Sequence, residues 1–396
     1  MRDDVAFVHA PELAAWRLAP DHPFRPDRVA VLEDLLRAVG LLRDAHVVPP
    51  APLPDGALAA VHDPRYLDVV ARASRGDAVD DLHRWGLGTP DTPVFAGMHE
   101  AVAGVCAATT HAVDRVLDGR AARAAAFAGG LHHAFADRAS GFCIYNDLAV
   151  AIRHARDRGA RVAYLDVDAH HGDGVQAAFY DDPHVLTFSV HESGHHLFPG
   201  TGHGYELGRG AGRGWSLNLP LEPFSDDAAV LEAFDLVAPE ALRAFRPDLI
   251  VLQAGADAHA RDPLADLSLT LRGYRALVAR VVELADAYAG GRIVVTGGGG
   301  YAAFDVVPRA WGHAWATLVD ATLPDALPEA WRARWADVAG GPLPASAWDD
   351  EADGGVPAAR RRAAADHDRA VARRLLRIAR PLWEAASDPA AGKETT

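Results

Sequence analysis

The chain has 396 residues, of which 39 are basic and 54 acidic, so its formal net charge is −15. Lys393 is the only lysine, which excludes P-loop enzymes, protein kinases and Schiff-base enzymes, because each needs a lysine in its site. With two cysteines, no apolar run long enough for a membrane span and an acidic balance, we expect a cytoplasmic protein without disulfides, membrane contacts or nucleic-acid partners.

Short β-rich runs alternate with longer amphipathic segments. Strands are predicted over residues 5–9, 124–128, 161–168, 185–190, 248–254 and 292–296. Helices are predicted over residues 29–39, 66–74, 97–117, 228–245 and 274–289. Several strands are apolar throughout, which is typical of parallel strands covered by helices on both faces. The pattern therefore predicts an α/β fold, a single three-layer domain with a mostly parallel central sheet.

The alternation ends at about residue 311. Residues 340–357 are rich in Pro, Gly and Asp and indicate a loop, whereas residues 358–386 have a helical period. We expect a main domain over residues 1–320 that carries the active site. An extension over residues 321–387 would pack on this domain, and residues 388–396 would form a disordered tail.

Four of the predicted strands run into polar or glycine-rich clusters. These are residues 129–133 (GGLHH), 166–173 (DVDAHHGD), 255–259 (GADAH) and 297–301 (GGGGY). In open α/β sheets, ligands bind outside the carboxyl ends of the strands. The four clusters, although far apart in the sequence, are therefore expected to meet in one crevice.

Two carboxylates and an imidazole follow one of these strands at a spacing of two. Asp166, Asp168 and His170 would share one face if the chain stayed extended. Such a group suits a divalent cation, and Asp257 could add an oxygen ligand from another strand. Asp168, His170 and Asp257 would leave coordination positions open, as catalytic zinc requires. The alternative is a polar loop whose aspartates cap helices.

His132 and His133 could be metal ligands, general bases or surface residues. Beside a metal group they indicate acid–base machinery, with Asp166 and Asp173 available to orient the two rings. Tyr301 follows four glycines, and its hydroxyl could donate to a developing oxyanion. The alternative for Tyr301 is a buried structural tyrosine.

These segments resemble the zinc-dependent histone deacetylase family. The match lies in residues 129–133 with 140–143 (SGFC), 164–174 (YLDVDAHHGDG), 253–257 (QAGAD) and 297–301, and it extends over about residues 5–315. The resemblance implies the arginase/deacetylase fold, with Zn²⁺ or Fe²⁺ on the three ligands named above. It also implies a histidine dyad in which His132 pairs with Asp166 and His133, the principal general base, pairs with Asp173. Tyr301 would polarise the amide carbonyl.

The same resemblance implies a narrow tunnel for the substrate. Gly141, Phe142 and Phe198 would wall it, Asp91 would hold the substrate backbone at the rim, and Arg28 would lie near an internal acetate cavity. A structural K⁺ would bind at carbonyls and side chains of Asp166, Asp168, His170, Ser189 and Val190.

Residues 257–264 (DAHARDPL), 306–311 (VVPRAW) and 327–331 (LPEAW) resemble the acetoin-utilisation branch of the bacterial deacetylases. This implies hydrolysis of Nε-acetyl-lysine in a non-histone protein, such as an acetylated acyl-CoA synthetase. An acetylpolyamine amidohydrolase is the alternative enzyme. A two-metal ureohydrolase is disfavoured by His259, which stands where a carboxylate is expected. A non-catalytic binding module is disfavoured because no catalytic residue is missing. The oligomeric state is left open.

Overall fold

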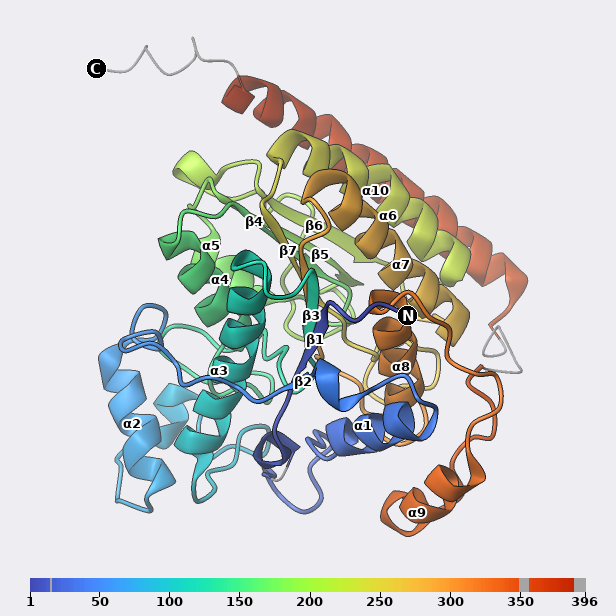
Figure 1. The fold of residues 1–396 in the computed structure, drawn as a ribbon. Helices are drawn as coiled ribbons and strands as arrows, with labels where there is room; N and C mark the ends of the chain where they lie inside the picture. Colours follow the sequence, from blue (N-terminus) through green and yellow to red (C-terminus); the bar gives the residue numbers. More distant parts are fainter. Residues whose placement is uncertain (15, 349–355, 388–396) are drawn as a thin grey trace.

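The computed structural model describes residues 1–14, 16–348 and 356–387, and within them one sheet forms the centre of the molecule (Figure 1). Its strand order is β2-β1-β3-β8-β7-β4-β5-β6, and every neighbouring pair is parallel. The strands are β1 (Val5–Val8), β2 (Val47–Val48), β3 (Arg123–Ala126), β4 (Val162–Asp166), β5 (Val185–Glu192), β6 (Ser216–Leu221), β7 (Leu249–Gln253) and β8 (Ile293–Thr296). The predicted α/β fold with a parallel central sheet is confirmed.

Helices cover both faces of the sheet (Figure 1). One face carries α2 (Pro64–Ser74), α3 (Met98–Leu117), α4 (Asp147–Asp157) and α5 (Asp173–Phe179). The other carries α1 (Arg28–Ala38), α6 (Asp227–Phe245), α7 (Leu271–Tyr288) and α8 (Val307–Leu318). Alternate residues of β4 supply the two cores, Ala163 and Leu165 on one side and Val162 and Tyr164 on the other. This is why the strand has no polar face.

The six predicted strands are present, but the two strands at the sheet edges were missed. β2 has only two residues, too few for a periodic signal. β6 contains Asn218 and Pro220 and therefore does not have the composition of an inner strand. Because β6 pairs only with β5, a proline without an N–H is tolerated there.

The C-terminal extension adds two helices. In α9 (Glu329–Ala339), the indole of Trp331 donates to the Val31 carbonyl of α1 at 3.0 Å. The long helix α10 (Ala358–Ser387) packs along α6 and over β6 (Figure 1). It matches the helical period predicted over residues 358–386. The predicted tail over residues 388–396 and part of the predicted loop over residues 340–357 lie outside the described residues.

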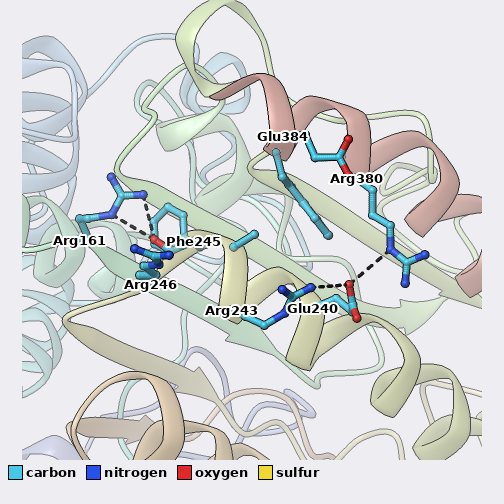
Figure 2. A pocket seen from close by; sticks show the side chains of 9 residues that line it. Arg161, Glu240, Arg243, Phe245, Arg246, Arg380 and Glu384 are labelled. Atoms are coloured by element: carbon cyan, nitrogen blue, oxygen red, sulfur yellow. Dashed lines mark hydrogen bonds and ion pairs between the residues drawn. The ribbon is translucent and has the colours of Figure 1, made fainter. Parts of the chain in front are cut away.

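A surface hollow of about 880 Å³ lies at the amino ends of β4 and β7, lined by four arginines, namely Arg161, Arg243, Arg246 and Arg380 (Figure 2). Arg161 donates to the last carbonyl of α6, at Phe245, at 3.0 and 3.2 Å. Arg243 and Arg380 both pair with Glu240. Since cations stabilise the carboxyl end of a helix, this cluster is accounted for by α6. The polar clusters predicted from the sequence lie at the other end of the strands, the carboxyl end.

Candidate active site

The four clusters predicted to meet follow β3, β4, β7 and β8, which are consecutive neighbours in the sheet. Their loops leave the carboxyl ends of these strands side by side. Glycines permit the close approach of the loops: a Cβ atom on Gly299 would collide with the carboxylates of Asp257 and Asp168, and one on Gly141 would collide with the ring of His133. The four segments therefore lie together in the structure, as the sequence predicts.

The spacing of Asp166, Asp168 and His170 puts them on one face only if the chain stays extended after β4. In the structure the chain turns there instead. The Asp166 carboxylate accepts a hydrogen bond from the Asp168 N–H at 3.1 Å, and the Asp168 carboxylate accepts one from the His170 N–H at 3.0 Å. Two successive aspartate turns result. They separate the side chains, so that Asp166 faces the histidine pair, whereas Asp168 and His170 face Asp257.

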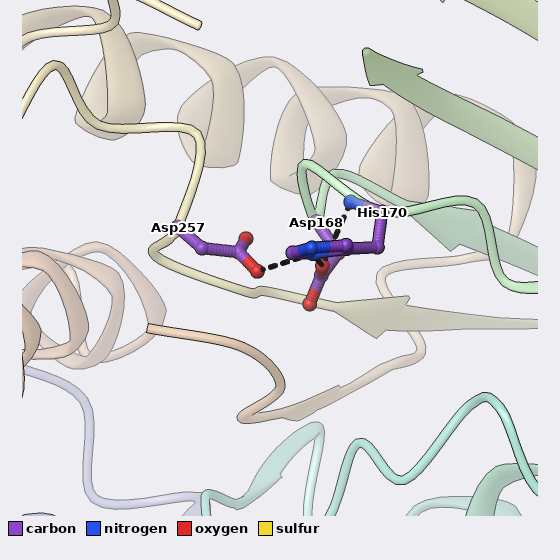
Figure 3. A group of neighbouring side chains, drawn as sticks. All are labelled: Asp168, His170 and Asp257. Carbon is purple, nitrogen blue, oxygen red and sulfur yellow. Dashed lines mark hydrogen bonds and ion pairs between the residues drawn. The ribbon is translucent and has the colours of Figure 1, made fainter. Parts of the chain in front are cut away.

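Asp168, His170 and Asp257 form a buried group of potential metal ligands (Figure 3). One ligand atom from each side chain lies within 4.8 Å of the others. His170 Nδ1 is 2.9 Å from Asp257 Oδ2 and 3.2 Å from Asp168 Oδ1. Two carboxylate oxygens and an imidazole nitrogen that point at one another are donors suited to a divalent cation.

The proton affinities of this group favour a cation among these donors. Burial, together with the charge of Asp168, raises the pKa of Asp257 to about 7. Burial opposes protonation of His170, but its hydrogen bonds to Asp168 and Asp257 prevail and raise its pKa to about 10. The excess negative charge of the two carboxylates is what favours a proton on His170. A divalent cation would neutralise the same excess charge and release that proton.

Neighbouring groups fix the orientation of the carboxylates. Asp168 Oδ2 accepts hydrogen bonds from Gln253 Nε2 at 2.6 Å and from the Gly299 N–H at 2.7 Å. Asp257 Oδ1 accepts one from the Ala169 N–H at 2.8 Å. Each carboxylate therefore keeps one oxygen for these supports and the other for the ligand group, as in metal sites with an ordered outer shell.

His132 and His133 lie beside this group, with ring centroids 3.9 Å apart. The Nδ1 of His132 is 2.9 Å from Asp166 Oδ2, and the Nδ1 of His133 is 2.7 Å from Asp173 Oδ1. The structure thus brings together both predicted histidine–aspartate pairs. With Nδ1–H donating to the carboxylate, each ring presents Nε2 for proton transfer.

The two imidazoles differ in proton affinity. Burial disfavours the charged form of His132, but the nearby Asp168 and Asp166 outweigh it and raise the pKa of His132 to about 9. Burial and the neighbouring charge of His132 lower the pKa of His133 to about 4. At neutral pH, His133 is therefore the neutral member that can accept a proton.

A ring of three aromatic side chains, Phe142, Phe198 and Tyr301, lies beside this group. Phe198, 47% exposed, lies edge-on to His133 at 5.1 Å between centroids. Phe142 packs edge-on against Tyr301 at 5.7 Å. Tyr301 also lies 6.4 Å from the His170 ring, and Asp262 accepts a hydrogen bond from its backbone N–H at 2.7 Å. Burial raises the pKa of Tyr301 well above its usual value, so its hydroxyl stays a donor.

Asp91 and Arg28 lie outside this ring of aromatic side chains. Asp91 is exposed, and its carbonyl accepts a hydrogen bond from His22 Nε2 at 3.2 Å, while His22 also contacts the Phe142 ring edge-on at 4.6 Å. Arg28 is buried and donates to the carbonyls of Gly298 and Gly300. Arg28 thereby holds the glycine run that precedes Tyr301.

Of the residues predicted for K⁺, Asp168 and His170 belong to the ligand group, whereas Ser189 and Val190 are in β5, next to β4. The hydroxyl of Ser189 is 2.8 Å from His191 Nδ1, and the side chain of Val190 is buried in the core. The Asp166 carboxylate also accepts a hydrogen bond from the Tyr164 hydroxyl at 2.5 Å. These contacts do not test the potassium site, which stays a prediction.

Three supporting residues were not singled out from the sequence. Gln253 supports Asp168, and Tyr164 supports Asp166. The Asn146 side chain donates to the carbonyls of Ala134 and His132 at 3.0 and 3.3 Å, which fixes the histidine loop. A polar residue at the end of an apolar strand, as at Gln253, was the signal available.

Comparison with known proteins gives a consistent result. A model of the "Histone deacetylase domain" family matches residues 22–318. The acetoin utilization protein AcuC of Bacillus subtilis (strain 168) is 46% identical over 317 residues, which cover 80% of this chain and 82% of that protein. AcuC of Staphylococcus aureus (strain MSSA476) is 39% identical over 317 residues, which again cover 80% of this chain and 82% of that protein.

Solved structures agree with this result. An HDAC homolog complexed with SAHA has a TM-score of 0.81 at 28% identity, covering 92% of this chain and 100% of that one. An HDAC homolog from Aquifex aeolicus has a TM-score of 0.78 at 28% identity over the same shares. Among the described residues, no helix is both long and apolar enough to cross a bilayer.

Proposed function

This chain belongs to the histone deacetylase family, and we propose that it removes the acetyl group from Nε-acetyl-lysine in non-histone proteins, such as an acetylated acyl-CoA synthetase, in the cytoplasm. The observation that carries the proposal is the convergence of a three-ligand metal group with two aspartate-paired histidines. This combination suits the attack of water on an amide carbonyl.

Asp168, His170 and Asp257 would hold Zn²⁺ or Fe²⁺, which supplies Lewis acidity toward the substrate carbonyl and the attacking water. His133, the neutral imidazole, takes a proton from that water. Tyr301 donates a hydrogen bond to the carbonyl oxygen as it becomes negatively charged. The C–N bond then breaks, one of the two histidines protonates the departing lysine amine, and acetate leaves separately.

Other residues would position the substrate. Phe142 and Phe198 would enclose the apolar stem of the acetylated lysine. Gly141 would form part of the same wall, close against the His133 ring. The exposed Asp91 would accept hydrogen bonds from the substrate backbone. Arg28 would keep the Tyr301 loop in place and lie near the path of the acetate. The structural K⁺ would support the loop after β4.

The test is hydrolysis of an acetyl-lysine peptide by the purified protein and by the variants His133→Ala and Tyr301→Phe. Each substitution should lower kcat by about 10²-fold or more, because a general base or an oxyanion donor is lost. Matched controls are His83→Ala on the surface and Tyr288→Phe at the end of α7, which should keep wild-type rates. Wild-type rates in either active-site variant would contradict the proposed roles.

An acetylated polyamine could use the same machinery, so the peptide is compared with N-acetylputrescine under identical conditions. The proposal predicts turnover of the peptide at least about tenfold faster in kcat/KM. Exclusive turnover of the polyamine would assign the second candidate function instead.

A further inference from the structure

A second hollow, with a volume of about 230 Å³, lies at the carboxyl end of β6, on the same side of the sheet as the proposed active site. The loop between β5 and β6 lines it on one side, and α10 lines it on the other. We propose that this hollow is a subsite for an apolar or aromatic side chain of the acetylated polypeptide, within about three residues of the acetyl-lysine. The inference rests on the proposed function, because it extends that substrate from one side chain to a stretch of chain.

Three aromatic rings line the loop side of the hollow. The ring of His203 lies 5.0 Å from that of His195 and stacks on Tyr205 at 5.1 Å with an interplanar angle of 18°. Tyr205 is 70% exposed, although its ring is held in place by this stack. An exposed and already oriented aromatic ring gains free energy when an apolar group covers it, at little cost in conformational entropy.

The helix side of the hollow is mostly apolar, although Arg374 of α10 also lines it. Val371, Leu375 and Ile378 all line it and are spaced four and three residues apart, so they lie on one face of α10. His367 and Glu222, 3.5 Å apart, also line the hollow and provide polar groups. The hollow is smaller than the roughly 300–1,000 Å³ of typical small-molecule sites. Its size and lining therefore suit one apolar side chain whose backbone stays in solvent.

The hollow lies within reach of a peptide held at the active site. His195 precedes Phe198, the ring beside His133, by three residues in the same loop, and three residues span at most about 11 Å. Pro220 and Glu222, at the end of β6, also line the hollow, and β6 is two strands away from β4. Two strand spacings amount to about 10 Å. An extended peptide covers this distance in about three residues.

A second metal site is not the favoured occupant. The hollow contains His195, His203, His367 and Glu222. However, the only group in the described part of the chain whose ligand atoms converge is Asp168, His170 and Asp257. The histidines of the hollow instead stack on aromatic neighbours or pair with a carboxylate. An apolar side chain is the ligand that this lining recognises.

The subsite is tested with peptides that carry one acetyl-lysine among alanines, in which a phenylalanine is placed in turn at each position up to about four residues on either side. We expect one position, about three residues from the acetyl-lysine, at which phenylalanine raises kcat/KM about tenfold over alanine. A flat profile across all positions would overturn the subsite.

Substitutions in the lining test whether the hollow causes the preference for phenylalanine over alanine. Tyr205→Ala and Ile378→Glu should each reduce the phenylalanine-to-alanine ratio from about tenfold toward one. Arg377→Glu introduces the same residue at the adjacent exposed position of α10 and should keep the wild-type ratio. A ratio that stays at about tenfold in both test variants would overturn the assignment. If Ile378→Glu does not fold, the exposed Tyr205→Ala still decides.

The two proposals fail in different ways. If peptides are hydrolysed at equal rates whatever their flanking residues, the subsite is wrong and the deacetylase assignment stands. If no acetyl-lysine peptide is hydrolysed, including the all-alanine one, both are wrong.

Discussion

Two adjacent histidines whose rings are 3.9 Å apart differ in pKa because of the groups around them. Asp168 and Asp166 outweigh burial and raise the pKa of His132, while burial and the charge of His132 lower the pKa of His133. The His132-His133 dipeptide alone does not explain this difference in pKa. It arises because the turns after β4 place two carboxylates near one ring and only Asp173 beside the other.

Gln253 sets the orientation of a metal ligand without being one. Its amide donates to Asp168 Oδ2 at 2.6 Å and accepts from the Gly255 N–H at 2.7 Å. We predict that Gln253→Ala weakens Zn²⁺ affinity by about 10- to 100-fold, the usual effect of losing an outer-shell partner. Competition with a chelator measures this affinity. Unchanged affinity would show that Asp168 is held well enough by Gly299 alone.

His62 makes the stability of the fold depend on pH. It is 1% exposed, its Nδ1 donates to the Phe135 carbonyl at 3.0 Å, and its Nε2 accepts from the Asn146 N–H at 3.1 Å. Burial lowers the pKa of His62 from 6.5 to about 4. Between these two values the unfolded chain binds a proton that the folded chain does not. The contribution of His62 to stability is therefore full above pH 6.5 and is lost as the pH falls toward 4.

The measurement is the free energy of unfolding of wild type and His62→Gln at about pH 7 and about pH 5. Wild type should lose about 1–2 kcal/mol more than the variant over this interval. His83→Gln, at an exposed position, is the control and should follow wild type. An equal pH dependence of His62→Gln and wild type would contradict the prediction.

Residue types and spacing predicted the ligand group and offered Asp166 and Asp173 as partners of the two histidines, because ligands bind outside the carboxyl ends of parallel strands. The pairing of each histidine with its own aspartate was implied by the family resemblance. The supports were not predicted. Gln253 carried only the general signal of a polar residue at the end of an apolar strand. Its contact with Asp168, 85 residues away, and those of Asn146 with carbonyls 12 and 14 residues away depend on the folded chain.

Among the elements, α10 connects the edge of the sheet to the loops near the site. Asp368 is fully buried and accepts hydrogen bonds from the Glu222 N–H at 2.9 Å and the Ser225 hydroxyl at 2.5 Å. Farther along, the indole of Trp383 donates to the Gly214 carbonyl at 2.8 Å. The helix thus holds both ends of β6 and forms one wall of the proposed subsite.

Removing the Asp368 carboxylate should loosen this attachment. We predict that Asp368→Ala lowers the free energy of unfolding by about 1–3 kcal/mol, because two buried donors lose their acceptor. Asp366→Ala, two residues earlier on an exposed face and paired only at the surface with Arg369, should cost less than about 1 kcal/mol. Equal costs in chemical denaturation would contradict the role assigned to Asp368.

Four helices, α4, α5, α8 and α9, were not predicted, although α4 has one buried and one more exposed face. Inner strands and two-faced helices such as α3 and α7 carry a clear apolar period. α8 was missed because nearly all of its residues are buried, which removes the polar face that marks a surface helix. The turns over residues 166–170 were missed because a spacing of two also suits an extended strand. The division into a main domain and an extension at about residue 320 stays a prediction.

In the molecule as a whole, the fold brings two buried carboxylates together at the site, and their mutual repulsion lowers its stability. The sheet places Asp168 and Asp257 within one buried group, and the charge of Asp168 together with burial raises the pKa of Asp257 to about 7. A cation that binds the folded chain but not the unfolded one stabilises the fold by mass action. Metal binding and folding are therefore expected to be coupled.

This coupling predicts that Zn²⁺ at about 1,000 times its Kd raises the free energy of unfolding by about 4 kcal/mol. Asp257→Asn should lose this stabilisation, and its metal-free form should be at least as stable as metal-free wild type, since one buried charge has been removed. Thermal unfolding with and without chelator measures both effects. A stabilisation by Zn²⁺ that survives in Asp257→Asn would place the metal elsewhere.

Metal-dependent hydrolysis of acetyl-lysine at the carboxyl ends of the strands is measured by acetate release from an acetyl-lysine peptide as metal is returned to chelated protein. We predict that activity is lost on chelation and returns in proportion to Zn²⁺ or Fe²⁺, reaching its maximum at about one equivalent per chain. Full activity in metal-free protein, or none at any metal loading, would contradict it.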